Sequence, residues 1–172
     1  MPYRLHMPKR LVIAGGNGYL GRHVARWFAD RNWDVVLLSR RAGTPTPSIR
    51  TVVWDGKSHG PWAGEVDGAD ALLNLAGRTV NCRYNAKNKA EIYASRLDST
   101  RVLGQAVAGA KNPPPAWLNA ASATIYRHAE DRPMDEATGE FGTDFSVDVC
   151  KRWEAELMAA DVPRTRRVAL RA

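Results

Sequence analysis

Short apolar runs alternate with longer amphipathic stretches along the whole of the 172-residue chain. The runs have the length of buried strands, and the longer stretches repeat apolar residues at helical spacing. The pattern predicts strands over about residues 11–14, 33–38, 49–54, 69–75, 117–123 and 167–170. It predicts helices after the first strand, over 86–110 and over 145–160, with at most one short helix within 56–67. Strands that alternate with helices indicate an α/β fold.

The second predicted strand is apolar enough to be buried on both faces, as strands of parallel sheets usually are. Residues 111–115, Lys-Asn-Pro-Pro-Pro, end the long helix over 86–110 because proline cannot continue it. Short loops and regular alternation favour a doubly wound parallel sheet with the strand order 3-2-1-4-5-6. In such sheets, ligands bind at the carboxyl ends of the strands.

Residues 15–21, Gly-Gly-Asn-Gly-Tyr-Leu-Gly, join the first strand to the first helix. Gly15 allows a sharp turn, Gly18 lets the backbone approach a pyrophosphate, and Gly21 lets the helix pack closely on the strand. The start of the helix also offers unpaired N–H groups to a phosphate. The pattern predicts a Rossmann-type cofactor turn formed by Gly15, Asn17, Gly18, Tyr19, Leu20 and Gly21. A glycine-rich turn can also be a tight loop without a ligand.

The second strand ends at Ser39-Arg40-Arg41, where NAD-binding folds carry an acidic residue for the ribose 2′-hydroxyl. Two guanidinium groups suit a 2′-phosphate, which a carboxylate would repel. The sequence therefore favours NADP over NAD. The alternative is that Arg40 and Arg41 are exposed loop charges.

Three further segments follow predicted strands. Asp55 ends the third strand, where it could lie near an adenine amino group or serve as a turn residue. The fourth strand closes with Leu75, Ala76 and Gly77, whose small residues let the backbone approach a cofactor. Ser122 lies at the end of the fifth strand. Because the carboxyl ends of parallel strands meet at one edge, we expect these residues to share a site with the glycine turn.

Composition narrows the class of protein. The chain is 44% hydrophobic and 25% charged, as soluble globular proteins are, and no apolar run reaches the roughly 20 residues of a membrane span. Cys82 and Cys150 form neither a metal motif nor a disulfide framework. Residues 1–10 lack a secretory pattern, so we expect a cytoplasmic protein.

The net charge is +7, with basic residues spread along the chain. This distribution suits attraction of an anionic cofactor better than binding to nucleic acid or membrane, and we expect neither of these partners. A basic surface without any specific partner would have the same composition.

The order and spacing of several motifs carry a family resemblance. After the glycine turn come Leu-Leu-Ser-Arg at 37–40, Val-Trp-Asp at 53–55, Asn-Leu-Ala-Gly at 74–77, a helix with Ser95, Arg96 and Thr100, Ala-Ser-Ala-Thr-Ile-Tyr at 121–126 and Cys-Lys-Arg-Trp-Glu at 150–154. Together they resemble the extended and atypical short-chain dehydrogenase/reductases, and most of all the sugar-nucleotide epimerase-like, or NAD-dependent epimerase/dehydratase, group. The resemblance implies an N-terminal extension over 1–9 and an NAD(P)-binding Rossmann domain over 10–172.

The resemblance also implies roles for single residues. Ser122 matches the family serine that hydrogen-bonds the reacting hydroxyl or carbonyl, although it could instead bond its own loop backbone. Tyr126 matches an aromatic residue that more often forms a wall of the site than an acid. Arg96 stands where many members carry an asparagine.

The sequence departs from the family at the proton-transfer pair, a tyrosine and a lysine four residues apart on the last long helix. The matching positions are Ser146 and Cys150, or Val147 and Lys151 after a slip of one residue. The epimerase-like group also tends to lack the pair. Cys150 could act as a thiol acid or pack as a small core residue, and it joins Ser122 and Tyr126 as a catalytic candidate.

Family members continue after the sixth strand into a smaller domain that closes over the substrate, and we expect this chain to lack most of that domain. We expect that the chain is a truncated form, natural or experimental, or that a partner completes the site. The expected function is that of an NADP(H)-binding oxidoreductase or epimerase-like protein acting on a carbonyl or hydroxyl of a small substrate, which could be nucleotide-linked. The alternative is a non-catalytic dinucleotide-binding module that senses redox state or scaffolds a partner. The helices over 86–110 and 145–160 resemble those that pair two family subunits, which predicts a homodimer.

Overall fold

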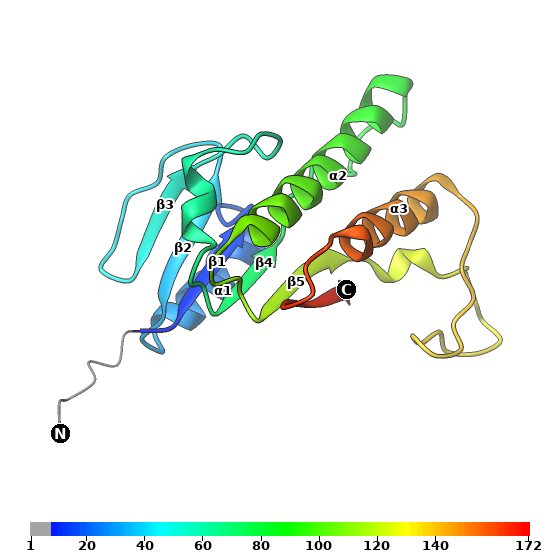
Figure 1. Cartoon of the computed structure of the whole chain (residues 1–172). Helices are drawn as coiled ribbons and strands as arrows, with labels where there is room; N and C mark the ends of the chain where they lie inside the picture. The colour runs from blue at the N-terminus through cyan, green and yellow to red at the C-terminus, as the bar shows by residue number, and fades with distance from the viewer. Residues whose placement is uncertain (1–7) are drawn as a thin grey trace.

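The computed structural model describes residues 8–172, which contain one six-stranded parallel sheet (Figure 1). The strands are β1 (Arg10–Ala14), β2 (Asp34–Ser39), β3 (Ile49–Val53), β4 (Ala71–Asn74), β5 (Ala116–Ala121) and β6 (Arg166–Arg171). Their order, β3-β2-β1-β4-β5-β6, confirms the predicted doubly wound topology. The extension over 1–9 lies outside the described residues except for its last two.

The helices also confirm the sequence pattern. They are α1 (Tyr19–Ala29), α2 (Ala86–Gly109) and α3 (Phe145–Ala159), together with the short 3₁₀ helices η1 (Pro61–Glu65) and η2 (Ala123–Ile125). The side chains of Asn85 and Asp144 accept hydrogen bonds from the N–H groups of Asn88 and Val147 and so fix where α2 and α3 begin. Within residues 8–172, no helix combines the length and the apolar character that a membrane span requires.

Apolar clusters cover both faces of the sheet. On one face, Val12, Val36 and Leu72 pack in a cluster that includes Leu103 of α2 and Leu157 of α3. Figure 1 shows α2 and α3 side by side over this face. The opposite face carries a smaller cluster against α1. Both faces of β1 and β2 are therefore buried, which explains their unbroken apolar sequences.

The apolar side chains of α1 do not all face the sheet. Gly21 and Ala25 are the buried residues of α1: Ala25 packs in the sheet cluster, and Gly21 lies against the glycine turn. Val24 and Phe28 pack partly against the sheet cluster. Trp27 is 52% exposed, and Leu20 is 56% exposed. The sequence predicted this helix, and of its larger apolar residues Val24 and Phe28 face the sheet whereas Leu20 and Trp27 do not.

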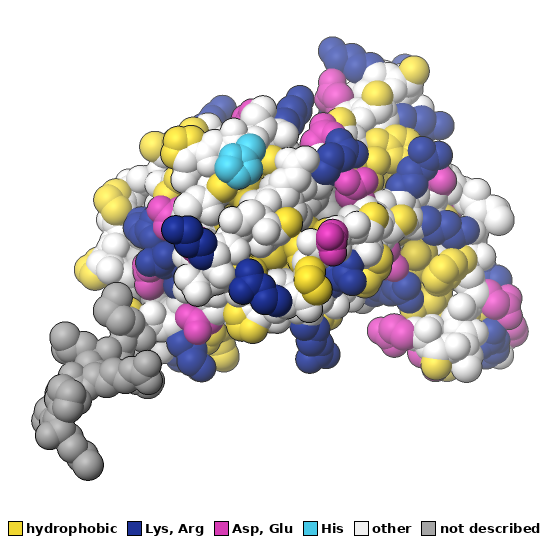
Figure 2. All heavy atoms as spheres, viewed as in Figure 1, with side chains coloured by type: hydrophobic (Ala, Val, Ile, Leu, Met, Phe, Trp, Pro, Cys, Tyr) yellow, Lys and Arg dark blue, Asp and Glu magenta, His cyan; other side chains and the backbone are white. Residues whose placement is uncertain are grey.

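Charges of both signs are interspersed on the face that carries α2 and α3. Figure 2 shows Lys and Arg side chains distributed over this face among Asp and Glu side chains. Several of these charges form ion pairs, including Arg101 with Glu156 and Arg152 with Asp148. The basic residues on this face therefore do not form one continuous patch.

Candidate functional site

The glycine turn follows β1 and contacts the chain at the ends of β2 and β4. Gly15 has a φ of +75°, and its N–H donates to the carbonyl of Leu38 at 3.0 Å. A Cβ at this position would lie 2.9 Å from the backbone N of Ala76 and 2.9 Å from the carbonyl carbon of Leu75. Glycine is required at residue 15 both by the backbone conformation and by the approach of the chain beyond β4. The turn is thus held against the ends of β2 and β4.

The other two motif glycines differ in their surroundings. A Cβ on Gly18 would meet only the carbonyl oxygen of Gly15, at 3.4 Å, so this position has open space beside it. A Cβ on Gly21 would lie 2.6 Å from the carbonyl oxygen of Gly16. The prediction that Gly21 permits close packing of helix on strand was therefore wrong about the contact: the helix packs against the turn itself.

The N-terminus of α1 has the features of an anion-binding helix end. Gly18 occupies the N-cap position without a side-chain hydrogen bond, and the first turn of α1 holds no acidic residue. Tyr19 and Leu20, which begin the helix, are exposed. Amide N–H groups at such an end remain available to a phosphate.

Ser39 links the glycine turn to the arginines that follow β2. Its hydroxyl accepts hydrogen bonds from Nδ2 of Asn17 at 2.8 Å and from the N–H of Arg41 at 3.4 Å. Its carbonyl accepts from the N–H of Trp54 at 3.0 Å. Arg40 and Arg41 are exposed, and neither forms an ion pair with a residue between 8 and 172. Both guanidinium groups are therefore available to a ligand.

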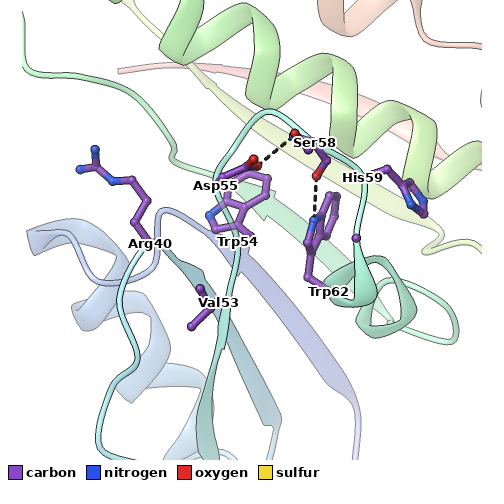
Figure 3. Close-up of a pocket in the computed structure, with 8 residues that line it drawn as sticks. Arg40, Val53, Trp54, Asp55, Ser58, His59 and Trp62 are labelled. Atoms are coloured by element: carbon purple, nitrogen blue, oxygen red, sulfur yellow. Dashed lines mark hydrogen bonds between the residues drawn. The ribbon is translucent and has the colours of Figure 1, made fainter.

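A cleft of about 510 Å³ lies beside Arg40 (Figure 3). Its lining consists of Arg40, Val53, Trp54, Asp55, Ser58, His59, Gly60 and Trp62. The indoles of Trp54 and Trp62 are buried edge to face, with ring centroids 5.2 Å apart. The indole N–H of Trp62 donates to the carbonyl of Ser58 at 3.0 Å. An aromatic floor with one arginine at its side suits a planar ligand that carries negative charge.

Asp55 has the turn role, one of the two considered for it. Its Oδ1 accepts hydrogen bonds from the N–H groups of Ser58 and Lys57, each at 2.8 Å, which lower the pKa of this exposed carboxyl. It is therefore a turn residue that also lines the cleft. The sequence did not identify His59 and Trp62 as lining residues. The available signal was the aromatic, glycine-rich segment directly after β3.

A buried polar network holds the chain where it leaves β4. The Oδ1 of Asn74 accepts from the N–H of Ala76 at 3.0 Å, while its Nδ2 donates to Oδ1 of Asn119 at 2.7 Å and to Oγ1 of Thr100 at 3.3 Å. Thr100 also accepts from the indole N–H of Trp153 at 3.1 Å. Side chains from β4, β5, α2 and α3 thus fix the segment from Leu75 to Gly77.

Ser122 lies at the carboxyl end of β5, as the sequence predicted, with its hydroxyl already hydrogen-bonded. It accepts from the N–H of Thr124 at 3.3 Å, lies 2.8 Å from that residue's hydroxyl, and donates to the carbonyl of Ala172 at 3.3 Å. The two contacts with Thr124 match the alternative in which the serine bonds its own loop. A role toward a substrate oxygen would require this hydroxyl to exchange at least one of them.

Tyr126 belongs to a charged cluster near the end of β6. Its hydroxyl accepts from Nη1 of Arg171 at 2.7 Å, and Arg171 also binds both carboxylate oxygens of Glu154, at 2.8 and 2.7 Å. Arg171 and Glu154 each expose only 16% of their side chains. The carboxylate raises the pKa of Arg171, so this residue keeps its charge. Tyr126 is thus anchored by a fixed cation.

The position that matches the family lysine is occupied by a buried thiol. Burial raises the pKa of Cys150, although the positive charge of Arg96 acts in the opposite direction. In the alternative register, Lys151 donates from Nζ to the carbonyl of Gly142 at 3.0 Å. The environment of Cys150 favours core packing over proton transfer. Within residues 8–172, no three His, Cys, Asp or Glu side chains group to hold a metal ion.

Comparison with known proteins identifies the family. A family model described as "NAD dependent epimerase/dehydratase family" matches residues 11–160. Epimerase family protein SDR39U1 of Bos taurus is 30% identical over 94% of this chain and 53% of its own length, and YfhF of Bacillus subtilis is 27% identical over 85% of this chain and 48% of its own. The chain thus spans about half the length of the curated relatives it matches.

Solved structures agree with this assignment. The crystal structure of human SDR39U1 (isoform 2) with NADPH superposes with a TM-score of 0.79 at 29% identity, over 94% of this chain and 52% of that one. A nucleoside-diphosphate sugar epimerase from Corynebacterium glutamicum gives a TM-score of 0.77 at 28% identity, over 95% of this chain and 33% of its own. On its sequence and its fold, this chain belongs to the NAD dependent epimerase/dehydratase family.

Proposed function

We propose that the chain is the NADP(H)-binding part of an oxidoreductase or epimerase that acts on a carbonyl or hydroxyl of a small substrate. The observation that carries this proposal is the pair of unpaired arginines, Arg40 and Arg41, directly after β2 and beside the aromatic cleft. A 2′-phosphate can bind a guanidinium fork there, and neither residue is an acid that would repel it.

The surrounding residues fit such a cofactor. A Cβ at residue 15 would fill the space between the turn and the chain at Leu75 and Ala76, whereas the space beside Gly18 is open. The N-terminus of α1 faces this turn without a side-chain cap. Gly18 and the first turn of α1 would hold the pyrophosphate, Arg40 and Arg41 the 2′-phosphate, and the cleft over Trp54 the adenine. The human relative SDR39U1 with NADPH supports this choice of cofactor.

When bound, NADP(H) supplies a hydride donor or acceptor. This chain's own residues would bind and orient. The Asn74 network would hold the segment from Leu75 to Gly77 rigid alongside the cofactor. Ser122 would donate to the substrate oxygen after releasing its bond to the carbonyl of Ala172. Tyr126, fixed by Arg171, would form a wall of the site.

NADPH oxidation measured against a panel of carbonyl compounds tests the proposal. We expect turnover with at least one compound, and the Ser122→Ala variant should lower kcat/KM while the Kd for NADPH stays unchanged. Thr124→Val is a matched control. It also removes one hydroxyl, that of Thr124, which is bonded to Ser122, but it leaves the hydroxyl of Ser122 in place. Tight NADPH binding without turnover by the full-length protein would favour the non-catalytic module instead.

We further propose a homodimer through α2 and α3. The two helices pack side by side and are tied on their exposed surface by Arg101 and Glu156, so they could present one joint face to a second copy. Sedimentation velocity at tens of micromolar should show a dimer. A single monomeric species at that concentration would contradict this arrangement.

A further inference from the structure

Arg96 is a half-buried cation on α2 without a carboxylate partner. Its Nη1 donates to two backbone carbonyls, those of Arg78 at 3.2 Å and Ile92 at 3.3 Å. Within residues 8–172 it forms no ion pair, and its Nε and Nη2 donate to no acceptor. Burial lowers the pKa of Arg96, because the charged form has lost part of its water. The guanidinium therefore retains donors and charge for a further ligand.

The acids of α2 and α3 are all paired with other arginines. Glu91 binds Arg78, Asp148 binds Arg152, and Glu154 binds Arg171. The titratable groups close enough to influence Arg96 are instead the Cys150 thiol and the Tyr84 phenol. The ring of Trp153 lies 5.1 Å from its guanidinium carbon. A partly desolvated cation among neutral side chains favours an anion that arrives from outside the chain.

Arg96 also lies next to the proposed cofactor site. A Cβ on Gly77 would be 3.4 Å from its guanidinium carbon and 3.6 Å from Nη2. Gly77 follows Leu75 and Ala76, the residues that contact the Gly15 turn. Arg40 marks the opposite side of that turn, at the end of β2. If the 2′-phosphate lies at Arg40, the reactive end of the cofactor extends toward Gly77 and Arg96.

We propose that Arg96 binds an oxyanion of the substrate, a carboxylate or a phosphate group, beside Gly77 at the end of β4. The location of this oxyanion relative to the reacting carbon rests on the proposed function, whereas the anion site itself does not. A guanidinium fork binds either group through two parallel hydrogen bonds, and it would select anionic substrates over neutral analogues. The substrate is accordingly a carboxylated or phosphorylated carbonyl or hydroxyl compound.

NMR of the Arg96 side chain in the full chain tests the site without a variant. The Nε–Hε resonances of Arg96 and of Arg101, an ion-paired arginine on the same helix, are followed while inorganic phosphate or acetate is added at constant ionic strength. NADPH is kept at saturation so that cofactor phosphates occupy their own subsites. We expect a saturable shift for Arg96 and none for Arg101. The absence of a saturable Arg96 shift would overturn the proposal.

Two matched variants then assign the anion. Arg96→Met should raise the apparent Kd for phosphate, followed at the Gly77 amide, about tenfold or more, whereas Arg101→Met, with the same loss of charge, should not. Arg96→Lys should restore part of the binding. Equal Kd values in the two Met variants would refute the site. A tenfold loss of NADPH affinity in Arg96→Met alone would assign the anion to the cofactor and overturn its assignment to the substrate.

A further measurement distinguishes failure of the proposed function from failure of the Arg96 anion site. If calorimetry detects no NADPH binding to the wild-type chain, the same titration without NADPH still shows whether Arg96 binds phosphate. Loss of cofactor binding with an intact phosphate shift would thus contradict the proposed function and leave the anion site supported.

Discussion

Two glycines with the same backbone conformation provide a test of how the glycine turn is packed. Gly15 and Gly68 have φ values of +75° and +76°. A Cβ on Gly15 would lie 2.9 Å from backbone atoms of Leu75 and Ala76, whereas a Cβ on Gly68 would meet nothing within 4 Å. Alanine at either position adopts a left-handed conformation that costs about 1–2 kcal/mol. Alanine at residue 15 also overlaps the backbone of Leu75 and Ala76, and this overlap costs about 1–3 kcal/mol more.

Urea unfolding followed by circular dichroism measures this difference. Gly68→Ala should lower the free energy of unfolding by about 1–2 kcal/mol, and Gly15→Ala by about 2–5 kcal/mol. The loss of unfolded-state freedom on replacing glycine is common to both variants and cancels in the comparison. Gly15→Ala should also weaken NADPH binding, because relieving the overlap displaces Leu75 and Ala76. Equal destabilisation by the two variants would refute the claim that the turn is packed against β4.

Three further substitutions or modifications test other parts of the site. Glu154→Gln leaves the guanidinium of Arg171 without its carboxylate, and should lower the free energy of urea unfolding by about 1.5–3 kcal/mol. Thr100→Val leaves the buried indole N–H of Trp153 unpaired, and should lower it by about 1–3 kcal/mol. Because burial raises the pKa of Cys150, its thiol stays protonated at pH 8, and iodoacetamide should label it only after unfolding.

Each of these has a matched control in the chain. Glu156→Gln breaks a pair with Arg101, which is 51% exposed, and should cost less than 1 kcal/mol. Ser99→Ala removes a buried hydroxyl that bonds only helix carbonyls, and should cost less than Thr100→Val. Cys82, which is partly exposed, should be alkylated in the folded protein. Comparable effects within a pair, or rapid labelling of Cys150, would contradict the described environments.

The fold, and the position of the candidate cofactor turn at the carboxyl ends of the strands, could be predicted because their signals are local. Buried parallel strands are continuous apolar runs, and the turn from Gly15 to Gly21 is contiguous in sequence. Strand order followed from alternation and short loops. The buried face of α1 was predicted only in part: Ala25 packs in the sheet cluster and Gly21 against the turn, whereas large Trp27 is 52% exposed. The spacing of apolar residues along a helix does not indicate how closely that helix approaches a sheet.

The side-chain contacts inside the site could not be predicted, since they join distant segments. Asn74 meets Thr100 and Asn119, which are 26 and 45 residues further along the chain. Arg171 reaches Tyr126 across 45 residues. No sequence spacing indicates that Arg96 has no carboxylate partner, because this depends on which arginines the nearby acids bind. The cysteine and serine candidates were found, but only the fold shows that one is buried and the other already bonded.

Calorimetric titration of the chain with NADPH and with NADH tests the central claim most directly. Arg40→Met removes one unpaired cation from the end of β2, and Arg26→Met removes an exposed cation from α1 as a control. The wild-type chain and Arg26→Met should bind NADPH at least tenfold more tightly than NADH, since charged hydrogen bonds contribute about 1.5–3 kcal/mol. In Arg40→Met this preference should largely disappear while NADH affinity is retained. Equal affinity of the wild-type chain for the two cofactors, or no binding of either, would contradict the account.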